Sequence, residues 1–183
     1  MALFGQNIPD QVRSRLERGE RVLTHAPVAA PAGGAPGTGS PSAGGGAVLV
    51  ATTRALYLPD GRSVLWQDID QARWSPDALT FVEEGFGEHT VRLRTELTGD
   101  PVDYRRMAET VAERVTSTIL VNRFVPFPAT GSATGFRLVA RRAPLGSEID
   151  WRVHLGEGLD PQDPRLSDSV SRALALLHEQ MGV

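Results

Sequence analysis

The fold is decided by the stretch 47-AVLVATTRALYLPDGRSVLW-66. Short apolar segments, rich in the residues that favour strands, occupy 47–53 and 55–58 and predict two β-strands. A third strand is expected over 63–66, because the Asp60–Gly61 pair before it is a strong signal for a β-hairpin. This stretch therefore predicts three consecutive antiparallel strands.

Further strands are predicted on both sides of this stretch, over 21–28, 69–74, 78–83 and 89–95. In the last of them Val91 and Leu93 alternate with Arg92 and Arg94, so one face of that strand should be buried and the other wet. A short helix is predicted before the strands, over 9–18, because Ile8, Val12 and Leu16 share one helical face. The first part of the chain thus contains seven predicted strands.

A long amphipathic helix is predicted after the seventh strand. Asp100 suits its N-cap and Pro101 its first helical position. Its apolar stripe is formed by residues at helical spacing, namely Ala108, Val111, Ala112, Val115 and Ile119. We expect this helix to run to about residue 123, although an extended segment over 119–127 is equally compatible with the sequence.

The remainder, residues 125–183, is predicted to form a ββα extension. Two strands over 136–141 and 149–155 are joined by a turn at 144–147, and the final helix begins after the capping pair Asp163–Pro164. Its apolar stripe is Leu166, Val170, Ala173, Leu174, Leu177 and Met181. Since a hairpin and one helix bury little apolar surface alone, we expect this part to pack on residues 1–124.

Composition narrows the chemistry that the chain can perform. All 19 basic residues are Arg, and Cys is absent, which excludes a lysine Schiff base, a Walker lysine and any thiolate nucleophile or metal ligand. The net charge of −3 gives no field that would attract nucleic acid. No leader peptide or membrane-spanning run is recognised, so a cytoplasmic location is expected. No cofactor is predicted.

A Gly/Pro-rich segment over 27–42 predicts a mobile loop, because it cannot bury enough apolar surface to offset its ordering entropy. It does not fit a phosphate-binding loop, since it lacks GK[ST] and precedes a strand. Charged residues are absent from 26–53. This last feature bears directly on what the chain can bind.

Seven strands followed by a helix are the layout of pleckstrin-homology-like (PH-like) barrels. The amino-acid sequence of this chain also resembles that of the bacterial PH-like and GRAM-like proteins. The segment VLVATTRALYLPDG at 48–61 is similar to one strand of those proteins, and SVLWQDIDQARW follows it. In those proteins a Trp, two polar residues and an Ile lead into the fifth strand, and Trp66, Asp68 and Ile69 occupy the corresponding positions here. The resemblance covers about residues 17–120, and the whole chain resembles an actinobacterial family. It implies an α+β fold: a seven-stranded antiparallel PH-like barrel capped by a C-terminal helix, with a packed ββα extension.

The resemblance also implies a binding module, because PH-like barrels bind phosphoinositide headgroups, peptides or other proteins. Lipid-binding members resemble one another in a basic cluster on the first two strands. The corresponding stretch here, 26–53, has no charge with which to hold a phosphate. Phosphoinositide recognition and membrane attachment are therefore disfavoured.

No catalytic, cofactor-binding or metal-ligating residue is predicted. The four histidines lack metal-ligand spacing: His25, His89, His154 and His178. The paired acids lie beside turns, where exposed carboxylates are common: Asp68 with Asp70, and Glu83 with Glu84. The tryptophans are expected in the core: Trp66, Trp74 and Trp151.

The densest basic group is Arg137, Arg141, Arg142 and Arg152. We expect these arginines to pair across strands with Glu148 and Asp150. The alternative is an anion or protein contact, because guanidinium groups bind carboxylates and phosphates in a bidentate manner.

These observations favour a non-enzymatic binding or scaffold module that contacts another protein or itself as a homo-oligomer. The alternative is a small-molecule binding protein or enzyme with a pocket between the barrel and the ββα extension. The sequence does not identify the binding face, the ligand or the oligomeric state.

Overall fold

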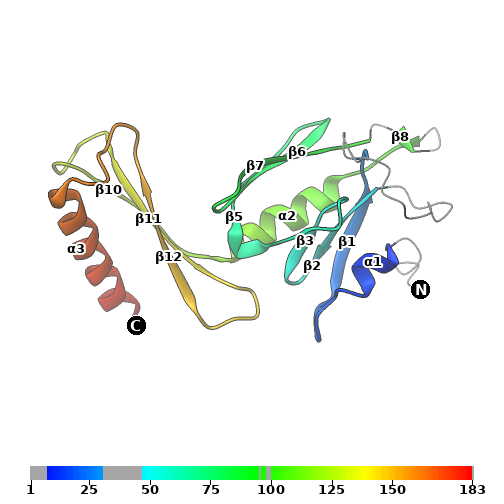
Figure 1. The fold of residues 1–183 in the computed structure, drawn as a ribbon, viewed down its shortest axis with the longest axis horizontal. Coiled ribbons are helices and arrows are strands. Elements are labelled where there is room, and N and C mark those ends of the chain that lie inside the picture. The colour runs from blue at the N-terminus through cyan, green and yellow to red at the C-terminus, as the bar shows by residue number, and fades with distance from the viewer. Residues whose placement is uncertain (1–7, 31–46, 95, 98–99, 183) are drawn as a thin grey trace. The chain divides into compact units, whose positions relative to one another are not determined.

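The computed structural model describes residues 8–30, 47–94, 96–97 and 100–182, drawn in colour in Figure 1. The chain divides into two compact units. Unit 1 runs to Thr118 and includes Ala143–Leu145, and unit 2 comprises Ile119–Arg142 and the chain from Gly146 onward. The division therefore falls after Thr118, whereas the sequence suggested residue 124.

The first sheet of unit 1 contains most of the stretch 47–66. Its four antiparallel strands lie in chain order, namely β1 (Val22–Pro27), β2 (Val48–Thr52), β3 (Ala55–Tyr57) and β4 (Ser63–Leu65). Gly61 has a φ of 86°, and the Asp60 side chain accepts a hydrogen bond from the Arg62 amide at 2.9 Å. Since a positive φ favours glycine, the Asp60–Gly61 hairpin is formed for the reason predicted.

The second sheet of unit 1 is made of β5 (Ile69–Trp74), β6 (Ala78–Glu83) and β7 (Gly87–Arg92). The 3₁₀ turn η1 (Trp66–Asp68) leads from β4 into β5. An isolated antiparallel bridge, Val28 with Leu93, joins the end of β1 to the end of β7. The bounds of β5 and β6 coincide with the predicted ones.

Helix α2 (Arg105–Ser117) contacts β1, β2 and β5, so it packs against both sheets of unit 1 (Figure 1). Its buried residues are Met107, Val111 and Val115, together with Tyr104 at its N-cap. The Tyr104 hydroxyl donates to the Pro27 carbonyl at 2.5 Å and accepts from the Arg94 amide at 2.9 Å. This one side chain thus ties the start of α2 to β1 and to the chain that follows β7.

The predicted limits of this helix were wrong at both ends. Asp100–Pro101 forms the short strand β9, paired with β8 (Glu96–Leu97), and Asp103 instead accepts a hydrogen bond from the Arg105 amide at 2.9 Å. At the other end Ile119–Pro126 is a strand, β10, so the extended alternative is confirmed. The run ILV followed by FV favours a strand because these residues have high β-propensity.

Unit 2 is a three-stranded antiparallel sheet with one helix on a face (Figure 1). The sheet order is β10, β11 (Gly135–Arg142), β12 (Ile149–Leu155), and the helix is α3 (Pro164–Met181). Its core is built from both: Phe127, Phe136, Leu138, Leu166 and Leu177. The predicted ββα unit is therefore a βββα unit, since β10 was not assigned to it.

The α+β class with antiparallel sheets and a C-terminal helix is confirmed. The seven predicted strands of unit 1 lie in two separate sheets, and no sheet among the described residues closes into a barrel. Helix α1 (Asp10–Arg13) is shorter than predicted, yet Val12 is buried with Ile8 and Leu16 beside it.

The predicted mobile loop, 27–42, lies largely outside the described residues. Within them, Pro27 ends β1 and Val28 is fully buried, so these two residues do not belong to a mobile loop. No helix in the described part of the chain is long and apolar enough to cross a membrane.

Candidate functional site

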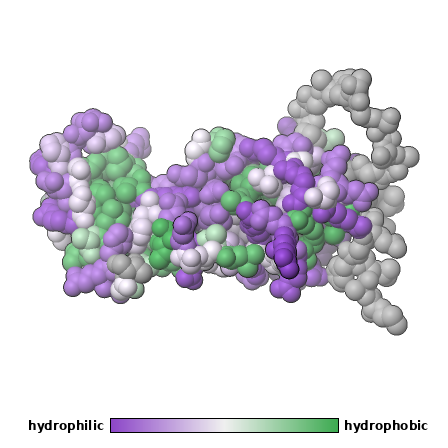
Figure 2. Space-filling view, turned by 60° about the horizontal axis from the view of Figure 1, so that its bottom comes forward, coloured by the Kyte–Doolittle hydropathy of each residue, from purple (hydrophilic) through white to green (hydrophobic). Residues whose placement is uncertain are grey.

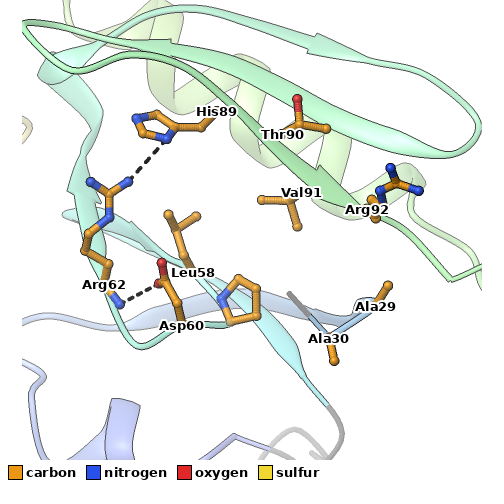
Figure 3. A pocket seen from close by; sticks show the side chains of 10 residues that line it. Ala29, Ala30, Leu58, Asp60, Arg62, His89, Thr90, Val91 and Arg92 are labelled. Atoms are coloured by element: carbon orange, nitrogen blue, oxygen red, sulfur yellow. Dashed lines mark hydrogen bonds between the residues drawn. The ribbon is translucent and has the colours of Figure 1, made fainter. Parts of the chain in front are cut away.

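An open depression of about 470 Å³ lies in unit 1, shown in Figure 3. Three segments line it: the end of β1, the β3–β4 hairpin and β7. Their lining residues are Ala29, Ala30, Leu58, Pro59, Asp60, Arg62, His89, Thr90, Val91 and Arg92. Its floor is apolar because Leu58 and Val91 are buried, and its rim is charged.

A cluster of three ionisable side chains stands at one end of the depression. His89 Nε2 lies 2.8 Å from Glu83 Oε2, and Arg62 Nη2 lies 3.3 Å from the same oxygen. Arg62 Nη2 also lies 3.4 Å from His89 Nδ1, the contact dashed in Figure 3. Only the Arg62–His89 contact has the geometry of a hydrogen bond, with His89 Nδ1 as the acceptor when it carries no proton, whereas His89 Nε2 and Glu83 Oε2 are close neighbours without hydrogen-bond geometry. The cluster therefore links the β3–β4 hairpin to the β6–β7 pair.

The prediction that both members of the pair Glu83 and Glu84 are exposed is wrong for Glu83. It is only 8% exposed, whereas its neighbour Glu84 is exposed as predicted. Strand alternation indicates this burial, because Phe81 and Leu79, two and four residues before Glu83, are buried on the same face of β6. Asp68 ends η1 and Asp70 lies in β5, and both are partly buried rather than exposed.

Arg92 stands at the other end of the depression, with its guanidinium drawn away from Arg62 in Figure 3. Nearby Asp77 has a lowered pKa, because the Ser75 hydroxyl donates to it at 2.7 Å and, less strongly, because Arg92 is close. Two guanidinium groups beside an apolar floor suit a small molecule that carries an anionic group. Asp60 and Glu83 offset part of that positive charge.

A second candidate surface lies in unit 2, along β12. This strand is terminal in its sheet, so one row of its backbone groups has no strand partner among the described residues. On the face that α3 covers, Val153 and Leu155 remain 39% and 38% exposed, and Leu176 of α3 is 59% exposed. Figure 2 shows hydrophobic surface gathered over the elements of unit 2, at the left. An unpaired edge with exposed apolar side chains is a typical site of strand addition.

Within the basic group, Arg141 lies opposite Asp150 in the register of β11 and β12, the placement that the predicted cross-strand pairing requires. Arg152 Nε binds Asp150 Oδ2 at 2.8 Å within one strand. Arg137 donates to Asn122 at 2.8 Å and lies 6.0 Å from the Phe124 ring centroid. Arg141 is buried at 2% exposure, and Arg142 is exposed.

The other predicted candidates are dispersed. His178 packs edge-on against Trp151 at 4.9 Å, while His25 and His154 lie in β1 and β12. The described residues contain no group of acidic and histidine side chains that could hold a metal ion. Of the tryptophans, Trp66 is fully buried and the other two are partly buried.

Comparison with known proteins gives no relative. No family model, no curated protein and no solved structure matches this chain. The two surfaces described above are therefore the basis on which function is proposed.

Proposed function

We propose that this chain is a non-enzymatic binding module that contacts another protein chain, of different or identical sequence, through β12 of unit 2. The observation that supports this proposal most is the unpaired outer edge of β12 with Val153 and Leu155 exposed beside it. Main-chain hydrogen bonds to an added strand would give affinity, and the apolar side chains would add buried area. The expected cytoplasmic location belongs to the same proposal.

We also propose that unit 1 is a divergent PH-like domain. Its four-stranded and three-stranded antiparallel sheets, followed by a helix that contacts both, support this. The Val28–Leu93 bridge between the first and seventh strands supports it further. In this proposal unit 1 is a folded domain to which unit 2 is attached, and unit 2 provides the strand edge that contacts the partner.

The test is affinity purification of the tagged full chain from a native-like host, followed by quantitative mass spectrometry. The variant V153D/L155D places two carboxylates beside the edge and should deplete the specific partner at least tenfold. L145D is the matched control, because Leu145 is 71% exposed in the β11–β12 turn and takes the same substitution. An identical set of co-purified proteins for the two variants would overturn the proposal.

A second candidate function is favoured by the depression in unit 1. Arg62 and Arg92 beside the apolar floor of Leu58 and Val91 would hold a small apolar anion. Benzoate, which joins one carboxylate to an apolar ring, is a suitable first probe, with binding followed by amide chemical shifts. R62Q and R92Q should weaken binding, whereas R73Q, an exposed change on β5, should not. Equal shifts in all three variants would exclude this site.

A further inference from the structure

We propose that the occupant of the β12 edge is a second copy of this chain, and that the two β12 strands pair antiparallel about a two-fold axis at Trp151. The proposal rests on the proposed function, since it names the partner of the same edge. The two sheets of unit 2 would then become one continuous sheet.

The backbone determines which residues of β12 can pair outward. The Gly156 amide donates to the Gly135 carbonyl at 2.9 Å, and the register continues without a bulge through Leu155–Phe136 to Ile149–Arg142. In an antiparallel ladder, hydrogen-bonded and non-hydrogen-bonded pairs alternate. Asp150, Arg152 and His154 therefore direct their backbone groups to β11. Those of Ile149, Trp151, Val153 and Leu155 point to the open edge.

A second β12 must meet these outward groups with its own outward groups, which restricts the register. Centring the two-fold axis on Trp151 pairs Ile149 with the partner's Val153 and gives about six new backbone hydrogen bonds. Centring it on Arg152 also matches outward groups, but it sets Arg152 against the partner's Arg152. Centring it on Val153 leaves Asp150 opposite the partner's Gly156.

The charges select the register centred on Trp151. There Asp150 lies opposite the partner's Arg152 and Arg152 lies opposite the partner's Asp150, so two opposite-charge pairs form across the axis. Exposed Glu148 also comes opposite the partner's His154. Arg152 already contacts Asp150 of its own strand, and its side chain is only 9% exposed, whereas that of Asp150 is 59% exposed. In the proposed dimer the exposed Asp150 carboxylates therefore approach guanidinium groups that are already held in place.

The other edge of the same sheet does not offer this complementarity. Strand β10 carries Asn122 and Arg123 and no acidic residue, and it ends at Pro126. Pairing β10 with itself would bring arginine near arginine without a carboxylate, and Pro126 cannot donate to a ladder. The side chains therefore favour self-pairing through β12.

Because a seven-residue edge is smaller than a standard interface of about 1,600 Å², a reversible dimer is expected, with dissociation in the micromolar range. Sedimentation velocity of the full chain from about 5 to 500 μM should therefore show a monomer–dimer equilibrium. D150R and R152D should each weaken dimerisation about tenfold or more, since each sets like charges opposite one another. D168R, an exposed change on α3, is the matched control and should leave the equilibrium unchanged.

Mixing the two single variants gives the decisive result. In a mixture of D150R and R152D, two arginines on one strand face two aspartates on the other, although neither chain regains its own Asp150–Arg152 pair. A heterodimer at least as tight as the native homodimer is expected. Circular dichroism of each variant shows whether it is folded. If folded variants fail to associate when mixed, the proposed register is wrong.

The variant D150C/R152C tests the register by disulfide formation. Since the native chain has no cysteine, no other disulfide can form. The two positions would form a non-hydrogen-bonded pair with Cα atoms about 4.5 Å apart, which a disulfide can span. Covalent dimers are expected on mild oxidation. A native chain that stays monomeric at 500 μM would overturn self-pairing, while loss of a heterologous partner in V153D/L155D would still support the proposed function.

Discussion

At the scale of single residues, Glu20 is the centre of one cluster of buried polar groups in unit 1. This carboxylate is 9% exposed, accepts from the Thr52 hydroxyl at 2.5 Å and lies 3.3 Å from the Tyr57 hydroxyl. Thr52, in turn, accepts from the Ala55 amide at 2.9 Å and so shapes the β2–β3 turn. A buried carboxylate satisfied in this way orders the strands around it, because removing any partner leaves an unpaired polar group.

Tyr57 should ionise at a higher pH in the folded protein than in the unfolded chain. Burial is the largest cause of its raised pKa, followed by the charge of Glu20 and the hydrogen bond to it. The neutral form is therefore favoured, so this contribution to stability is complete below the unfolded pKa near 10. It is lost as the pH rises through the higher folded pKa.

Absorbance at 295 nm can follow this titration, because the chain has only two tyrosines. In Y104F only Tyr57 titrates, and the pH midpoint of its titration should be higher in the folded variant than in the same variant in 8 M urea. Adding E20Q should lower that midpoint towards the value in urea. A folded Y104F that titrates as it does in urea would contradict the cause assigned to Tyr57.

At the scale of elements, the ends of helices show what local sequence could and could not predict. Asp163 caps α3 as expected: its side chain accepts from the Arg165 amide at 2.9 Å, and Gly182 ends the helix with a φ of 71°. The similar pair Asp100–Pro101 does not cap α2, because it pairs with Glu96–Leu97 instead. The same two-residue signal therefore has different outcomes where a strand partner is available.

Removing the Asp163 cap should destabilise unit 2 selectively. The pKa of Asp163 is lowered by its side-chain hydrogen bond to Arg165 and then by backbone donors at the start of α3. Its contribution is therefore present above the unfolded pKa of about 3.9 and lost as the pH falls through the lower folded pKa. D163A should lower the melting temperature at pH 7 by a few degrees, and D163N by less, because Asn also caps helices.

The comparison at pH 3 completes this test. There the native chain has lost much of the carboxylate's advantage, so the difference between it and D163A should shrink. A constant difference in melting temperature from pH 7 to pH 3 would show that the charge of Asp163 does not contribute.

At the scale of the whole molecule, each unit has a hydrophobic core of its own. In unit 1, Leu56 and Trp66 are fully buried, and in unit 2 Phe136 and Leu138 are. Such cores permit each unit to open without the other. From the sequence, a second part is expected after residue 124, because the hydrophobic patterns restart after the long helix.

Hydrogen exchange of paired core variants tests this independence. F136A should accelerate exchange in β10–β12 and α3 and leave β2, β3 and β6 nearly unchanged, because a Phe→Ala change costs about 3–5 kcal/mol. L56A should produce the opposite pattern. If either variant accelerated exchange equally in both units, the chain would be a single cooperative structure.

The sequence predicted the bounds of β5 and β6 well, since β6 alternates clearly and turn residues separate it from β5. It did not predict the candidate sites. Glu83 meets Arg62 and His89 only through the packing of strands that are distant in sequence. That β12 is an edge depends on the order of strands in its sheet, which periodicity does not contain.

The way in which β1 and β2 are joined has a practical consequence. Pro27 is the register partner of Val48, and the Val28 amide donates to the Ala47 carbonyl at 2.8 Å, so one rung of a ladder fixes both ends of the connecting segment. Doubling the length of such a connection costs only about 0.6 kcal/mol in closure entropy. An epitope or a second folded domain could therefore be spliced between residues 31 and 46 while the strands keep their register. Related chains can be expected to differ in length here before they differ anywhere in the sheet.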